Sequence, residues 1–145
     1  MNDKLKHNEL TDVVISCFYT VYNALGYGFL EKVYENALLH ELTKRGVSAS
    51  CQFPIIVYYD GKTVGEYFAD MVVESSLIIE IKAAKNIIPE HEAQLLNYLK
   101  ATDIEVGLLL NFGPKPEFRR KAFDNSGKSN NDLFGTRITS DERGF

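Results

Sequence analysis

The chain has 145 residues, of which 45 % are hydrophobic and 25 % charged, and this suits one globular domain with a single core. The formal net charge of −4 excludes a protein coated in basic patches, although a local basic groove remains compatible with it. The longest apolar runs are only a few residues and the polar N-terminus has no signal-peptide core, so we expect a cytoplasmic protein without a membrane span.

Three amphipathic helices are predicted. The first covers about residues 11–25 and the second about residues 30–45, and a glycine follows each at the position that favours a helix C-terminus, Gly26 and Gly46. The third covers about residues 89–101, because its first residue is a proline and its first turn is acidic. These helices leave two separate stretches of the chain for strands.

Four strands are predicted between and after these helices. Residues 52–73 alternate and are rich in β-branched and aromatic side chains, with Asp60-Gly61 as a hairpin turn. A second turn at residues 74–76 leads into the strand 77–84, and the apolar run 104–113 predicts a strand buried on both faces. The order α-α-β-β-β-α-β predicts an α/β (α+β) fold with a mixed four-stranded sheet flanked by helices.

The C-terminal segment differs in composition from the rest. Residues 125–145 are polar and rich in Asn, Ser and Gly. We therefore expect one domain over residues 1–124, followed by a mobile or loosely packed tail.

Two carboxylates and one ammonium are predicted to meet in the sheet. Glu80 and Lys82 lie two residues apart on one strand and so point to the same face. Counting from the turn near Ser75, Asp70 on the preceding strand faces residue 80 or 81. Two close carboxylates repel each other, and a hard divalent cation such as Mg²⁺ removes that conflict. A surface ion pair of Glu80 and Lys82 is the alternative interpretation.

The same residues resemble a known family. Asp70 followed by Glu80-Ile81-Lys82 resembles the PD-(D/E)xK nuclease superfamily, and residues 28–34 resemble the signature of the small GxxExxY proteins, compact members of that superfamily. The resemblance extends over about residues 10–124 and includes the segments 42–46, 52–54, 91–99 and 107–113. Ala69 replaces the proline of the superfamily name, and Phe68 stands where many members carry a basic residue.

The resemblance implies a restriction-endonuclease-like core and a catalytic set. In it, Asp70 and Glu80 bind Mg²⁺ directly, with Mn²⁺ able to substitute, and Glu31 reaches the ion through water. Lys82 and Gln94 complete the catalytic residues, and Tyr98 contacts the substrate or orients Lys82. The implied activity is endonuclease or exonuclease hydrolysis of phosphodiesters, with DNA favoured over RNA.

A basic cluster and an alternative function complete the predictions. Arg119 and Arg120, with Lys115 and Lys121 beside them, are predicted to hold a phosphate backbone, and a solvated C-terminal helix is the other interpretation. The acidic balance and Phe68 favour a catalytically silent nuclease-fold module that binds nucleic acid or regulates a protein partner. By analogy with small nucleases, we also expect a homodimer.

Overall fold

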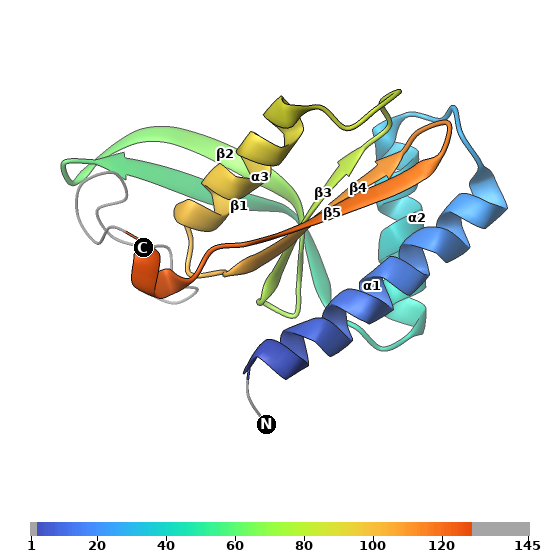
Figure 1. Ribbon diagram of the computed structural model, residues 1–145, viewed down its shortest axis with the longest axis horizontal. Coiled ribbons are helices and arrows are strands. Elements are labelled where there is room, and N and C mark those ends of the chain that lie inside the picture. The colour runs from blue at the N-terminus through green and yellow to red at the C-terminus, as the bar shows by residue number, and fades with distance from the viewer. Residues whose placement is uncertain (1–2, 129–145) are drawn as a thin grey trace.

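The computed structural model describes residues 3–128, which form three α-helices, five strands and one short 3-10 helix (Figure 1). In chain order they are α1 (Asp3–Leu25), α2 (Glu31–Lys44), β1 (Ala49–Tyr59), β2 (Lys62–Val73), β3 (Leu77–Lys82), α3 (Pro89–Lys100), β4 (Val106–Phe112), β5 (Pro116–Ala122) and η1 (Asn125–Gly127). Within this part of the chain, no helix combines the length and apolar character needed to cross a membrane.

The predicted order of elements is confirmed as far as β4, and the predicted strand count is wrong. The five strands form one mixed sheet in the order β1-β2-β3-β4-β5, in which only the β3–β4 pair is parallel. The fifth strand pairs with β4 along residues 116–122. The C-terminal helix, which was the alternative interpretation of the basic cluster, is therefore wrong. An edge strand exposes much of its length, so its charged sequence, PEFRRKA, lacks a continuous apolar pattern.

Turn chemistry explains the β1–β2 hairpin. Asp60 and Gly61 both have positive φ, 54° and 76°, which is the conformation of a type I′ turn. The hairpin predicted at this dipeptide is therefore confirmed.

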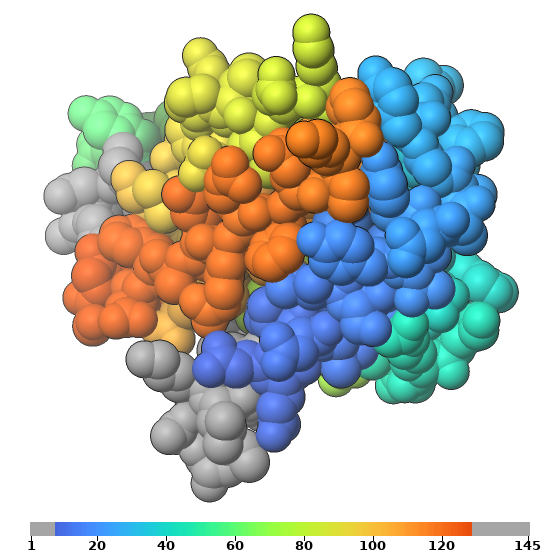
Figure 2. Space-filling view, turned by 45° about the vertical axis from the view of Figure 1, so that its right-hand side comes forward, coloured from blue at the N-terminus to red at the C-terminus, as the bar shows by residue number. Residues whose placement is uncertain are grey.

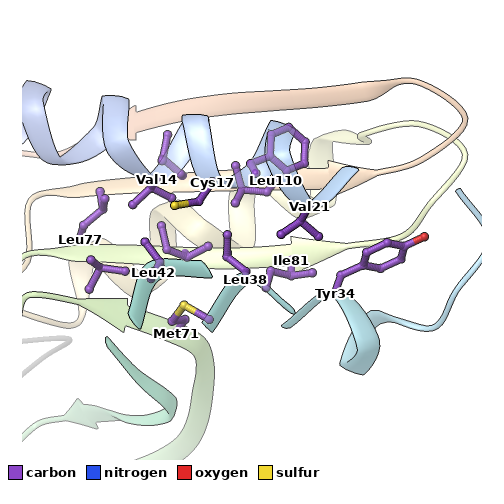
Figure 3. Close-up of a cluster of buried hydrophobic side chains, with 14 of the residues drawn as sticks. Val14, Cys17, Val21, Tyr34, Leu38, Leu42, Met71, Leu77, Ile81 and Leu110 are labelled. Atoms are coloured by element: carbon purple, nitrogen blue, oxygen red, sulfur yellow. The ribbon is translucent and has the colours of Figure 1, made fainter. Parts of the chain in front are cut away.

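Each face of the sheet has its own hydrophobic cluster. One cluster joins α1 and α2 to the strands, and Figure 3 shows several of its side chains, among them Val14, Leu38, Met71 and Leu110. The other joins α3 to the strands through residues such as Leu95. The helices thus cover both faces of the sheet, as expected for a central strand such as β4, which is buried throughout.

The sheet divides between β2 and β3. Their antiparallel ladder has only three pairs, ending at Met71 opposite Ile79, while β2 continues to pair with β1 over most of its length. Figure 1 shows the two strands diverging at this point, where β2 continues to the left into the β1–β2 hairpin and β3 continues to the right. Beyond this fork Asp70 and Glu80 are not paired with each other in the β2–β3 ladder, and this is where the candidate site lies.

The described part of the C-terminal segment packs against the domain. The buried ammonium of Lys128 donates to the backbone oxygens of Thr102 and Ile104, at 2.8 and 2.9 Å, and to Asn125 Oδ1 at 2.6 Å. The remaining residues of the predicted tail, 129–145, lie outside the described residues.

Replacing Lys128 by methionine is expected to destabilise the fold by about 1–3 kcal/mol, because buried carbonyl oxygens lose their donor. Denaturant unfolding measures the change, with Lys115→Met as the control at an exposed lysine. An unchanged unfolding midpoint would show that the hydrogen bonds of the Lys128 ammonium add nothing to stability.

Candidate functional site

Asp70 and Glu80 are linked to each other across the fork. The backbone N–H of Asp70 donates to Glu80 Oε2 at 2.9 Å, and the N–H of Ile81 donates to Asp70 Oδ2 at 2.7 Å. The two side chains thereby replace the ladder hydrogen bonds that end at Met71 and Ile79. Where the two strands diverge, two backbone N–H groups have no partner across the fork, and the two carboxyl groups accept hydrogen bonds from them. These hydrogen bonds hold both side chains in defined positions.

The two carboxyl groups are costly to ionise in this position. Glu80 is only 3 % exposed, and burial first, then the charge of Asp70, raises the pKa of its carboxyl to about 8. Burial also raises the pKa of Asp70, against the lowering effect of the Ile81 N–H. Such pKa displacement in a buried carboxyl pair is characteristic of functional sites and of sites that take a cation.

Lys82 lies beside this pair and contacts the third helix. Its Nζ donates to Gln94 Oε1 at 3.4 Å, and its positive charge counteracts part of the rise in the pKa of both carboxyl groups. Buried Asn111 pairs with the backbone N–H and C=O of Ala84, at 2.9 and 3.0 Å, directly after β3. Asn111 therefore keeps the end of β3 against β4 and limits the positions open to Lys82.

Glu31 is the first residue of α2 and is exposed, and its charge contributes to raising the pKa values of Asp70 and Glu80. The loop before it is held by Tyr34, whose hydroxyl donates to the Gly26 carbonyl at 2.6 Å and accepts from the Phe29 N–H at 3.1 Å. Gly28 has a φ of 119°, which favours glycine. The glycine and tyrosine of the GxxExxY stretch thus shape the loop that places Glu31.

Removing the hydroxyl of Tyr34 is expected to loosen this loop. Tyr34→Phe retains the ring stack on Phe112, with centroids 4.3 Å apart, but loses both loop hydrogen bonds. We expect the free energy of unfolding to fall by about 1–2 kcal/mol. Thermal or denaturant unfolding checks this against Tyr19→Phe, whose hydroxyl has no hydrogen bond to the side chains and backbone described here. Equal stability of the two variants would contradict the loop-holding role.

Glu35 and Gln52 are site residues that the sequence predictions missed. Glu35 is 5 % exposed, accepts from Lys32 Nζ at 3.2 Å and from Gln52 Nε2 at 3.3 Å, and its charge raises the pKa of Asp70. Gln52 has a φ of 54° within β1, between residues that pair with Met71 and Ala69 on either side of Asp70. The backbone of a residue other than glycine is strained in this conformation, and strain of this kind concentrates at functional sites. The sequence feature that could have indicated Glu35 was its spacing of one helical turn from Glu31.

Two residues of α3 flank the carboxylates. Tyr98 is largely buried, and burial first, then Glu80 and Asp70, raises the pKa of its hydroxyl to about 12. His91, which the sequence leaves outside the catalytic set, accepts the Ile88 N–H on Nδ1 at 3.3 Å and so caps the helix. Gln94 and Tyr98, one turn apart, thus both face the site.

The basic cluster is divided between the two faces of the sheet. Glu80, Leu109 and Arg119 are cross-strand partners, so Arg119 shares the α3 face with Glu80 at about 10 Å, two strand spacings. Arg120 points the other way and donates to Asn8 Oδ1 of α1. Figure 2 shows β5 on the surface beside α1. Lys121 pairs with Glu92 at 2.7 Å, which reduces its charge available to a ligand.

The donor set fits a hard divalent cation with few protein ligands. Among the described residues, no group of three or more His, Cys, Asp or Glu side chains is placed to hold a metal ion. Asp70 and Glu80 each use one carboxyl oxygen for a backbone N–H, and no described group hydrogen-bonds to Asp70 Oδ1 or Glu80 Oε1. Two carboxylates completed by water match the coordination that Mg²⁺ prefers.

Comparison with known proteins identifies a shared fold and a family. No curated protein matches the chain. The crystal structure of SSO0001 is similar with a TM-score of 0.52 and 21% sequence identity over 81% of this chain, which shows a shared fold; this chain covers 59% of that one. The family model of the PD-(D/E)XK nuclease superfamily matches residues 8–121. The chain belongs to the PD-(D/E)XK nuclease superfamily.

Proposed function

We propose that this chain is a Mg²⁺-dependent nuclease of the GxxExxY group, with Mn²⁺ able to substitute, and that it hydrolyses phosphodiesters of DNA in preference to RNA. The observation that carries the proposal is the reciprocal pairing of Asp70 and Glu80 at the sheet fork, with Lys82 and Gln94 beside it. Membership of a nuclease superfamily supports the reaction class.

The residues have separate roles in this proposal. Asp70 Oδ1 and Glu80 Oε1 are the oxygens that would hold the cation, and Glu31 would contact it through water. A bound Mg²⁺ supplies Lewis acidity, which makes water more acidic and offsets charge on phosphate oxygens. Lys82, oriented by the amide oxygen of Gln94, would stabilise the negative charge that develops on the phosphate or hold the attacking water.

A substitution at Asp70 tests the metal role. Asp70→Asn should abolish measurable Mg²⁺ binding in a calorimetric titration and also abolish cleavage, while the fold is retained. Asp60→Asn is the matched control, because Asp60 lies in the exposed β1–β2 turn, where Asn is equally compatible with positive φ. Unchanged Mg²⁺ affinity in Asp70→Asn would refute the ligand assignment.

A catalytically silent nuclease-fold module, for nucleic-acid binding or a regulatory protein interaction, is the second candidate. It is favoured by Phe68, a half-exposed aromatic side chain two residues before Asp70, and by the neutralisation of Lys121 by Glu92. Both features reduce positive charge near the site. The discriminating assay follows cleavage of single-stranded, duplex and flap DNA and of RNA with Mg²⁺ and with Mn²⁺, and light scattering of the same samples tests the predicted homodimer. Binding without cleavage under all these conditions would favour the module.

A further inference from the structure

A groove lies between α3 and the β1–β2 hairpin, next to the candidate active site. Its volume is about 550 Å³, within the range of small-molecule sites. The hairpin contributes Val57, Val64 and Tyr67, and α3 contributes Gln94, Asn97 and Tyr98. One wall is thus apolar and aromatic, while the other presents two amide side chains, the ring of Tyr98 and the charged Glu90 and Lys100.

The groove is continuous with the carboxylate site through α3. Gln94 lines the groove and also accepts the hydrogen bond from Lys82 at 3.4 Å. Tyr98 lines the groove too, and the charges of Glu80 and Asp70 are among the causes that raise the pKa of its hydroxyl. A ligand whose phosphate lies at the carboxylates would therefore have the groove within reach of its next chemical group.

The groove walls suit a flat aromatic ligand with polar edges. Tyr67 is 50 % exposed, and its ring is tilted by 44° against Tyr98 with centroids 5.9 Å apart. Nucleobases stack on exposed aromatic rings of this kind, and Asn and Gln amides hydrogen-bond to base edges. A purely apolar ligand would cover the Asn97 amide and the Nε2 of Gln94 without pairing them, so a base matches the groove better than an apolar peptide does.

Only an unpaired base can use these contacts. In a continuous duplex both faces of each base are already stacked on neighbouring bases, so the ring of Tyr67 could not stack on a base. The groove therefore selects a strand with at least one base out of the duplex near the reacting phosphate.

We propose that the groove between α3 and the β1–β2 hairpin binds an unpaired nucleobase of the strand whose phosphate lies at Asp70, Glu80 and Lys82. This inference rests on the proposed function and narrows it, since it makes single-stranded or flap-like nucleic acid the substrate class. Tyr67 then determines specificity, whereas the carboxylates and Lys82 act on the phosphate.

Base stacking can be measured without cleavage. Short single-stranded DNA and RNA oligonucleotides that carry 2-aminopurine report stacking by loss of fluorescence, with Ca²⁺ in place of Mg²⁺. We expect Tyr67→Ala to weaken this binding about tenfold and Tyr67→Phe to preserve it, because the ring provides the contact. Tyr59→Ala is the control, since Tyr59 is an exposed aromatic of the same hairpin that does not line the groove. Comparison of the DNA and RNA probes shows which of the two nucleic acids the groove binds.

Cleavage assays with Mg²⁺ separate this inference from the proposed function. If wild-type protein cleaves and Tyr67→Ala loses its preference for flaps over duplex, the inference holds. If wild-type protein cleaves but Tyr67→Ala binds and cleaves every substrate like Tyr59→Ala, the groove inference is overturned and the nuclease proposal stands. If the probe is quenched through Tyr67 but nothing is cleaved, the groove inference holds and the nuclease proposal fails.

Discussion

Replacing Lys82 by alanine is expected to reduce phosphodiester cleavage by about 10²–10⁴-fold, the range for losing a positioned catalytic group. Lys82 follows Glu80 by two residues on β3, its Nζ contacts Gln94, and its charge acts on both carboxyl groups. Alanine removes this ammonium but leaves the carboxylates and their backbone hydrogen bonds in place. The loss should therefore appear in the rate of the chemical step, with Mg²⁺ binding largely retained.

The matched control is Lys85→Ala, which removes an exposed lysine three residues further along the chain. Its cleavage rate should stay close to that of wild type, and both variants should unfold at similar denaturant concentrations. A Lys82→Ala protein that cleaves at the Lys85→Ala rate would remove Lys82 from the catalytic set. A large loss in both variants would instead indicate that the segment after β3 affects activity through its conformation.

The metal-free protein is expected to lose stability as the pH rises from about 5 to 8. Folding raises the pKa of Glu80 from 4.5 to about 8, so the folded state binds more protons than the unfolded state throughout this interval. The favourable contribution is complete below the unfolded pKa and disappears as the pH passes the folded one. Since each pKa unit corresponds to about 1.4 kcal/mol, we expect a loss of a few kcal/mol, and the raised pKa of Asp70 acts in the same direction.

Denaturant unfolding in the presence of a chelator, at intervals between pH 5 and 8, measures this slope. Glu80→Gln should flatten it, because a neutral amide oxygen still accepts the Asp70 N–H but does not titrate. Glu66→Gln, at an exposed position of β2, should leave the slope unchanged. Mg²⁺ at pH 8 should restore stability to wild type and not to Glu80→Gln. A wild-type slope equal to that of Glu80→Gln would refute the buried, reluctantly ionised state of Glu80.

Local sequence patterns were sufficient for much of the fold and for the proximity of Asp70 and Glu80. The order of elements as far as β4 follows from periodicity, and the Asp60-Gly61 turn follows from its need for positive φ. Turn counting placed Asp70 opposite residue 80 or 81, and the structure has hydrogen bonds between Asp70 and both Glu80 and Ile81. These predictions succeed because a short turn determines which residues meet across a hairpin.

Only the tertiary structure decided the surroundings of that pair. The strand β5 forms because the free edge of buried β4 requires a partner, which a charged heptapeptide does not reveal by itself. The burial of Glu35 and the strained backbone of Gln52 depend on how α2 packs against β1 in the sheet. The opposite directions of Arg119 and Arg120 follow from the pairing of β5 with β4. The sequence by itself determined which chemical groups are present and which neighbours face across a turn. Burial, strain and the groove beside α3 arise from contacts between segments far apart in the chain, and these set the pKa values and the space open to a substrate.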